Sequence, residues 1–74
     1  MNRLPNLNAR KIVGALKRAG FCEDGQRGSH LYLWHEGKKL LTSVPIHGRD
    51  VKRSLLKQII QQAGLSEEEF RGLL

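Results

Sequence analysis

The chain has 74 residues, of which 39% are hydrophobic and 27% are charged, a composition typical of one small globular domain over residues 1–74. Thirteen Lys and Arg residues stand against seven Asp and Glu residues. The resulting net charge of +6 favours a polyanionic partner: nucleic acid, an anionic membrane or an acidic protein. The chain is too short for a Rossmann, P-loop or barrel enzyme, and it contains none of their glycine motifs.

Membrane insertion and disulfide chemistry are not expected. The longest apolar stretches fall far below the roughly 20 residues that a membrane-spanning helix needs, and the N-terminus lacks the apolar core of a signal peptide. The single cysteine, Cys22, excludes an internal disulfide and a Cys-rich metal site. We therefore expect a cytoplasmic protein that associates with no membrane and uses no metal or other cofactor.

The N-terminal part predicts a lead-in followed by a helix. Pro5 opposes helix formation within residues 1–7, and Asn8 can cap the first turn with its side-chain oxygen. Over residues 9–19, apolar residues recur on one stripe of a helix while most basic residues point elsewhere. Gly20 follows a basic last turn and predicts that the helix ends in a left-handed backbone conformation.

Three strands and their turns are predicted next, from apolar runs and turn chemistry. In chain order they are a short strand over residues 21–23, a turn over 24–28, a strand over 30–35, a hairpin turn over 36–38 and a strand over 40–44. The last strand should end there because Pro45 has no N–H to donate to a sheet.

A second helix is predicted from Arg49 or Asp50 to about Ala63, because apolar residues recur there every four positions. A glycine ends it, and Ser66 with Glu69 forms a capping box that begins a short third helix. The element order is therefore α-β-β-β-α-α. Strands grouped between helices indicate an α+β fold, with a three-stranded antiparallel sheet and helices on one face.

The segment from Arg27 to His30 is the first candidate site. Arg27 supplies a fixed cation, Gly28 exposes bare backbone N–H groups, and Ser29 adds a hydroxyl. His30 can give or take a proton near neutral pH. These groups suit RNA cleavage, in which a base and an acid act on the ribose and the leaving oxygen while cations stabilise the phosphate. The alternative is a solvated or hydrogen-bonded histidine at the start of a strand.

Two further histidines lie later in the chain. His47 follows the third strand, and His30 begins the second, so a hairpin could bring the two rings together as an acid–base pair. The alternative for His47 is a loop residue near the start of the second helix. His35 ends its strand beside the turn and is predicted to be a solvated edge histidine. Histidine spacing typical of a metal site is absent.

Aromatic and basic residues provide the remaining signals. Alternation places His30, Tyr32 and Trp34 on one face of their strand, either as an open face on which bases stack or as the core face. Basic residues at the start of the second helix oppose the helix dipole, which suggests that they meet an anion. The predicted RNA- or phosphate-binding residues are Arg27, Gly28, Lys38, Lys39, Arg49, Lys52 and Arg53.

Several short motifs, in order along nearly the whole chain, resemble those of the HicA-like mRNA interferase toxins. They are Leu4-Pro5, the stretch Leu16 to Phe21 that ends in Ala19-Gly20-Phe21, Gly28-Ser29-His30, Val44-Pro45 with His47, and Gln62-Ala63-Gly64-Leu65. One departure is Ser54-Leu55-Leu56, where the family often has Gly-Thr-Leu at the entry to the second helix.

The resemblance implies a fold similar to double-stranded-RNA-binding domains. It also implies a metal-independent endoribonuclease that cleaves mRNA and arrests translation and growth, and a HicB-like antitoxin that covers the active face in a hetero-oligomer. The family's catalytic histidine falls on His30, with His47 and Ser29 as possible support. The alternatives are a non-catalytic RNA-binding module of the same fold and a module that binds only an acidic protein.

Overall fold

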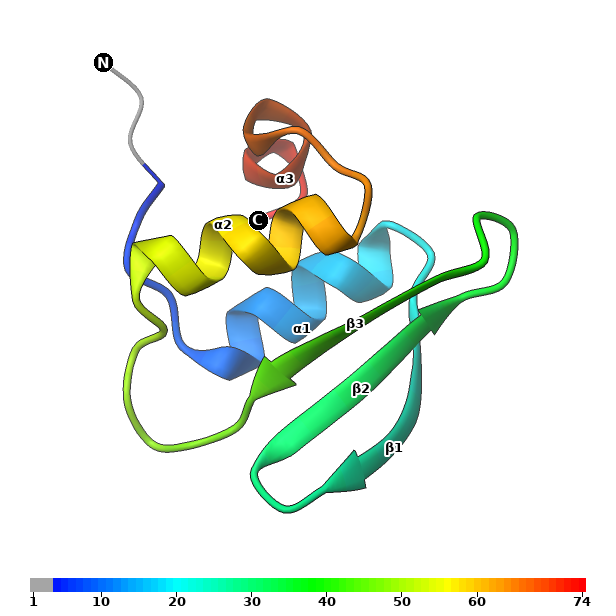
Figure 1. The fold of residues 1–74 in the computed structure, drawn as a ribbon. Helices are drawn as coiled ribbons and strands as arrows, with labels where there is room; N and C mark the ends of the chain where they lie inside the picture. Colours follow the sequence, from blue (N-terminus) through cyan, green and yellow to red (C-terminus); the bar gives the residue numbers. More distant parts are fainter. Residues whose placement is uncertain (1–3) are drawn as a thin grey trace.

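The structure, a computed structural model, describes residues 4–74 as a sheet covered by helices (Figure 1). The elements are α1 (Ala9–Arg18), β1 (Cys22–Arg27), β2 (His30–His35), β3 (Leu40–Pro45), α2 (Arg53–Gln62) and α3 (Glu67–Gly72). The strands are antiparallel in the order β1-β2-β3, and α1 and α2 lie side by side on one face. This arrangement confirms the predicted α+β fold, which is like that of double-stranded-RNA-binding domains and adds a short C-terminal helix.

The core lies between the helices and one face of the sheet. Ile12 and Leu16 of α1, Leu33 of β2 and Leu56 of α2 are fully buried there. The predicted cap of α1 is present, because the Lys11 N–H donates to the Asn8 side-chain oxygen at 2.9 Å. The predicted left-handed glycine after α1 is also present.

Strand β1 differs from its prediction. The sequence predicted a strand over residues 21–23 and a turn over 24–28, whereas the strand continues to Arg27. Its register against β2 shifts between Glu23 and Gln26, where Gly25 has a φ of +108°. Asp24-Gly25 therefore forms a bulge and not a turn, since one strand can absorb extra residues without ending.

The tight turn between β1 and β2 is limited to Gly28 and Ser29. Arg27 pairs with His30, so the loop has two residues, and Gly28 has a φ of +56°. This is the position at which a type II′ hairpin turn places glycine. A substituted residue would meet backbone strain here, although there is open space around the site of its Cβ.

The lead-in and the start of α2 hold each other in place. Helix α2 was predicted from Arg49 or Asp50 but begins at Arg53. Val51 is not helical: its N–H donates to the Leu7 carbonyl at 2.7 Å in an isolated bridge, and both residues are buried. The predicted lead-in over residues 1–7 is therefore anchored at Leu7, while its first three residues lie outside the described residues.

Helix α3 begins with the predicted capping box. The Glu69 N–H donates to the Ser66 hydroxyl at 3.0 Å, and the Ser66 N–H donates to the Glu69 carboxylate at 2.8 Å. The latter bond lowers the pKa of Glu69. A lowered carboxyl pKa stabilises the fold at neutral pH, and this contribution disappears as the pH falls through the lowered value.

We expect Ser66→Ala to reduce the free energy of unfolding by about 1 kcal/mol, because an N-cap hydrogen bond is lost. Urea titration at pH 7 measures the change. Ser66→Asn, which keeps a capping oxygen, should stay near the wild-type value. Equal stability of the Ala variant and the wild type would contradict a stabilising cap at this position.

Candidate active site

His30 is exposed at the start of β2, between the two neighbouring strands. Its register partner in β1 is Arg27, and its partner in β3 is Pro45. Directly opposed residues in antiparallel strands share a face. The buried Leu33 lies on the helix-covered face, so alternation puts His30 on the opposite, helix-free face together with Tyr32 and Trp34. The structure thus selects the open face that the sequence left undecided.

Arg27 is held beside His30 by an aromatic ring. The Arg27 guanidinium carbon lies 5.7 Å from the centroid of the Tyr32 ring, a cation–π distance. The adjoining turn residue Gly28 carries no side chain, and open space surrounds it. The result is a cation, a bare backbone and an accessible imidazole at one corner of the sheet, which is the chemical set expected from the sequence.

His47 lies at the same end of the sheet as His30. The Ile46 N–H donates to the Ser29 carbonyl at 2.6 Å, so the segment before His47 continues along the start of β2. The Nδ1 atom of His47 accepts from the Arg49 N–H at 3.2 Å. The ring itself is exposed.

His35 is not the solvated edge residue that was predicted. Its ring is partly buried and packs edge-on against Phe21, with the ring centroids 5.1 Å apart. Its Nδ1 accepts from the Lys38 N–H at 3.0 Å, which fixes the turn after β2. A Cβ at Gly20 would lie 2.7 Å from His35 Nε2, so the helix end also requires glycine. His35 therefore has a packing role.

The predicted phosphate-binding residues fall into separate groups. Lys38 and Lys39 belong to the β2–β3 turn, at the end of β2 opposite to His30, and Lys39 pairs with Glu36. The Arg53 side chain donates through Nε to the Leu4 carbonyl at 2.7 Å and ties α2 to the lead-in. Lys38 and Lys39 therefore lie away from the His30 corner, whereas Arg53 is at the start of α2 with its side chain bonded to the lead-in.

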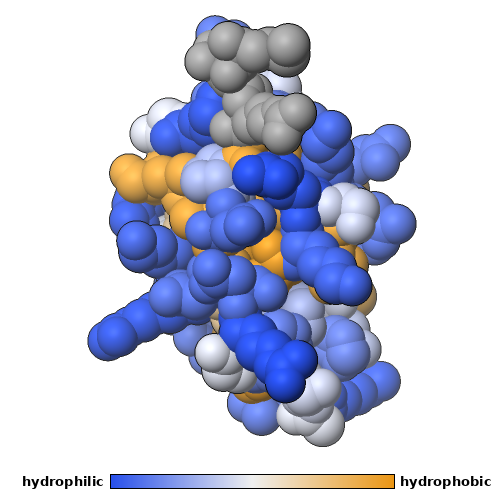
Figure 2. All heavy atoms as spheres, turned by 90° about the vertical axis from the view of Figure 1, so that its left-hand side faces the viewer, coloured by the Kyte–Doolittle hydropathy of each residue, from blue (hydrophilic) through white to orange (hydrophobic). Residues whose placement is uncertain are grey.

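Arg49 and Lys52 lie in the loop between β3 and α2, and both are exposed. This end of the molecule, with the starts of α1 and α2, is mostly hydrophilic, with hydrophobic atoms visible between the polar side chains (Figure 2). Because the loop follows Pro45, the register partner of His30, its cations lie at the same end of the sheet as the imidazole. They add positive charge there.

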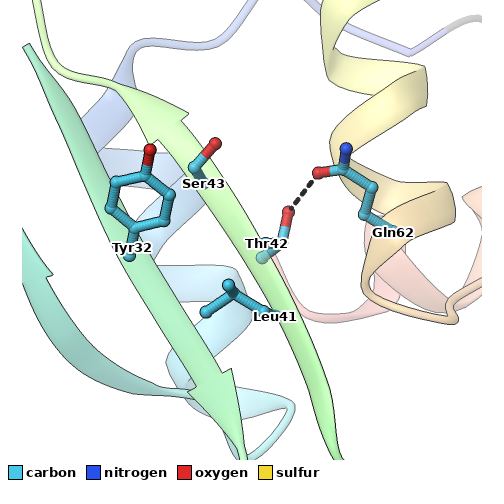
Figure 3. A pocket seen from close by; sticks show the side chains of 5 residues that line it. All are labelled: Tyr32, Leu41, Thr42, Ser43 and Gln62. Atoms are coloured by element: carbon cyan, nitrogen blue, oxygen red, sulfur yellow. Dashed lines mark hydrogen bonds between the residues drawn. The ribbon is translucent and has the colours of Figure 1, made fainter.

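A shallow hollow of about 260 Å³ lies along β3 (Figure 3). Tyr32, Leu41, Thr42, Ser43 and Gln62 line it. The Thr42 hydroxyl donates to the Gln62 side-chain oxygen at 3.0 Å and joins β3 to α2. Leu41, Ser43 and Gln62 were not predicted from the sequence to border a site. The hairpin register could have indicated the first two, because it places them opposite Trp34 and Tyr32.

A family model for the HicA toxin of bacterial toxin–antitoxin systems matches residues 9–65. The chain belongs to the HicA toxin family. It is therefore a toxin of a toxin–antitoxin system and has an antitoxin as its partner. No curated protein matches the chain in a sequence search. Within this HicA-family toxin, the matched residues include α1, all three strands and α2, whereas α3 follows the matched region.

Two features of this HicA-family toxin concern other kinds of site. Within residues 4–74, no three or more His, Cys, Asp or Glu side chains gather in a way that could hold a metal ion. None of the helices in this same part of the chain has the length and apolar character needed to cross a membrane.

Proposed function

We propose that this HicA-family toxin is a cytoplasmic endoribonuclease that cleaves mRNA and thereby stops translation and growth. The observation that carries the proposal is the exposed His30 on the helix-free face, with Arg27 as its direct cross-strand partner. His30 acts as a general acid or general base in the reaction. A HicB-like antitoxin is the partner that holds the activity in check.

The proposed reaction uses the RNA's own 2′-hydroxyl as nucleophile. A base takes its proton, O2′ forms a bond to the adjacent phosphorus, and the bond from phosphorus to O5′ breaks. An acid protonates O5′, so the products are a 2′,3′-cyclic phosphate and a 5′-hydroxyl. Histidine suits either proton transfer, and His47 or Ser29 could support His30 at this corner.

Positive charge assists the same step. Arg27 is fixed over the Tyr32 ring next to His30, so it can meet the phosphate without first being ordered. Arg49 and Lys52, in the loop after β3, extend the positive charge, and we propose that they hold neighbouring phosphates. The nucleophile comes from the substrate, so the proposed step requires no metal-bound water.

We expect the purified chain to cleave single-stranded RNA in excess EDTA and to leave 2′,3′-cyclic phosphate ends. A substrate with one 2′-deoxynucleotide at the cleaved position should resist cleavage there, because its nucleophile is missing. Gel analysis and mass spectrometry of the products measure both effects. Loss of cleavage in EDTA would refute the metal-independent step. RNA binding without any turnover would instead support the non-catalytic RNA-binding module.

A further inference from the structure

The two edges of the sheet differ in their protection against strand pairing. Strand β1 forms one edge and carries Glu23, Asp24 and Arg27, and a bulge interrupts its register. Charges and bulges are common devices that keep an edge strand from pairing with another chain. Strand β3 forms the other edge. Its residues from Leu40 to Val44 carry no charge, and their register against β2 is continuous.

The hydrogen-bond pattern shows which backbone groups of β3 face outward. The Ile46 N–H bonds to the Ser29 carbonyl, and bonded and non-bonded pairs alternate along an antiparallel ladder. Leu41 and Ser43 are therefore at non-bonded pairs, and their N–H and C=O groups point away from β2. Among residues 4–74, no backbone hydrogen bond joins either residue to another element outside the sheet. Both donors are available to an added strand.

The hollow along β3 supplies a place for a side chain of such a strand. Tyr32, Leu41 and Ser43 border it on the helix-free face, and Gln62 of α2 borders it beyond the strand (Figure 3). Leu41 is 48% exposed, which leaves apolar surface beside unpaired backbone groups. Strand addition draws affinity from main-chain hydrogen bonds and specificity from pockets for alternate side chains. The β3 edge offers both unpaired main-chain groups and a hollow for a side chain.

We propose that the free edge of β3 binds an extended strand of the antitoxin, which continues the sheet to four strands; the inference rests on the toxin–antitoxin function proposed above. A second copy is a poor occupant, because each chain carries +6. Antiparallel β3–β3 pairing would also bring Lys38 and Lys39 of each copy toward the basic loop after β3 of the other. An acidic antitoxin strand with an uncharged centre meets the same edge without that repulsion.

The test uses the complex of the full chain with its purified antitoxin. Amide hydrogen exchange of the free chain and the complex is compared residue by residue. The Leu41 and Ser43 amides should exchange about tenfold more slowly, or slower still, in the complex, because they become hydrogen-bonded. The Glu23 amide on the β1 edge serves as an internal control and should change little.

A matched pair of variants tests the same hydrogen bond. Ser43→Pro removes an outward N–H at an edge position, where proline is tolerated, and Ser43→Ala keeps that N–H. We expect Ser43→Pro to weaken antitoxin binding by about tenfold or more in calorimetry, and Ser43→Ala to bind like the wild type. Exchange measurements on the unsubstituted chain give an answer even if the Pro variant does not fold.

The outcomes separate this inference from the proposed function. If the antitoxin stops RNA cleavage while exchange at Leu41 and Ser43 stays unchanged, the strand addition is wrong and the nuclease function stands. If these amides become protected but the free chain cleaves no RNA, the nuclease function is wrong and the strand addition stands. A dimer of the free chain with protected β3 amides would assign the edge to a second copy and overturn the inference.

Discussion

His30→Ala should reduce RNA cleavage by about 10²- to 10⁴-fold, the usual contribution of a positioned acid–base group. The imidazole is exposed on the helix-free face and is not part of the core, so its removal should leave folding nearly unchanged. Single-turnover cleavage of a fluorescent RNA gives the rate, and urea titration gives the stability. Cells that overproduce the variant should continue to grow, whereas cells that overproduce the wild type should stop.

The control variants separate proton transfer from RNA binding. His30→Gln keeps a polar side chain of similar size but cannot exchange protons, so it should be as inactive as the Ala variant while RNA binding persists. Arg27→Gln removes the neighbouring cation and should weaken binding, with a smaller dependence of affinity on salt. Full cleavage by His30→Ala would exclude His30 from the chemistry, and the proposed acid–base role of this residue would be wrong.

Phe70→Ala should destabilise the fold far more than the loss of the Ser66 cap or of the His30 ring. Phe70 is fully buried in the core, although α3 follows the family-matched residues 9–65. Truncation of a buried phenylalanine costs about 3–5 kcal/mol. A domain of this size has only about 4–11 kcal/mol of total stability, so much of the variant should be unfolded near body temperature. Thermal unfolding followed by circular dichroism measures the loss.

Leu74→Ala is the matched control for this prediction. Leu74 follows the same helix but is 46% exposed, so its truncation should change the free energy of unfolding by less than about 0.5 kcal/mol. If Phe70→Ala were as stable as Leu74→Ala, α3 would be an appendage and not part of the folded core. A large difference between the two would show that the core extends beyond the matched family region.

The sequence predicted best those helices and strands in which the buried positions follow the spacing of the apolar residues. Strand β2 begins and ends at the predicted residues, because its apolar residues alternate between two partly or fully buried faces. Strand β1 was predicted too short because all six of its residues are exposed and carry no apolar pattern. Val51 extended the apparent helical spacing of α2, yet its burial arises from the bridge to Leu7, 44 positions away in the chain.

The candidate site was predictable in its residues but not in its surroundings. Gly28 and His30 are recognisable from local chemistry, and the hairpin places them as expected. Which face of β2 stays open depends on where the helices pack. Leu31 and Leu33 on one face are as apolar in pattern as Tyr32 and Trp34 on the other, so the sequence alone did not distinguish the two faces. The prediction for His35 was wrong because its packing partner, Phe21, directly precedes β1 and is not a sequence neighbour.

Cys22 and Trp34 face each other across β1 and β2, and each is the one residue of its type in the chain. The thiol is exposed, so a maleimide dye could be attached there without engineering a new cysteine. Indole emission from Trp34 would report the occupancy of the helix-free surface. The molecule thus contains a paired optical reporter on the side where its partners are proposed to bind.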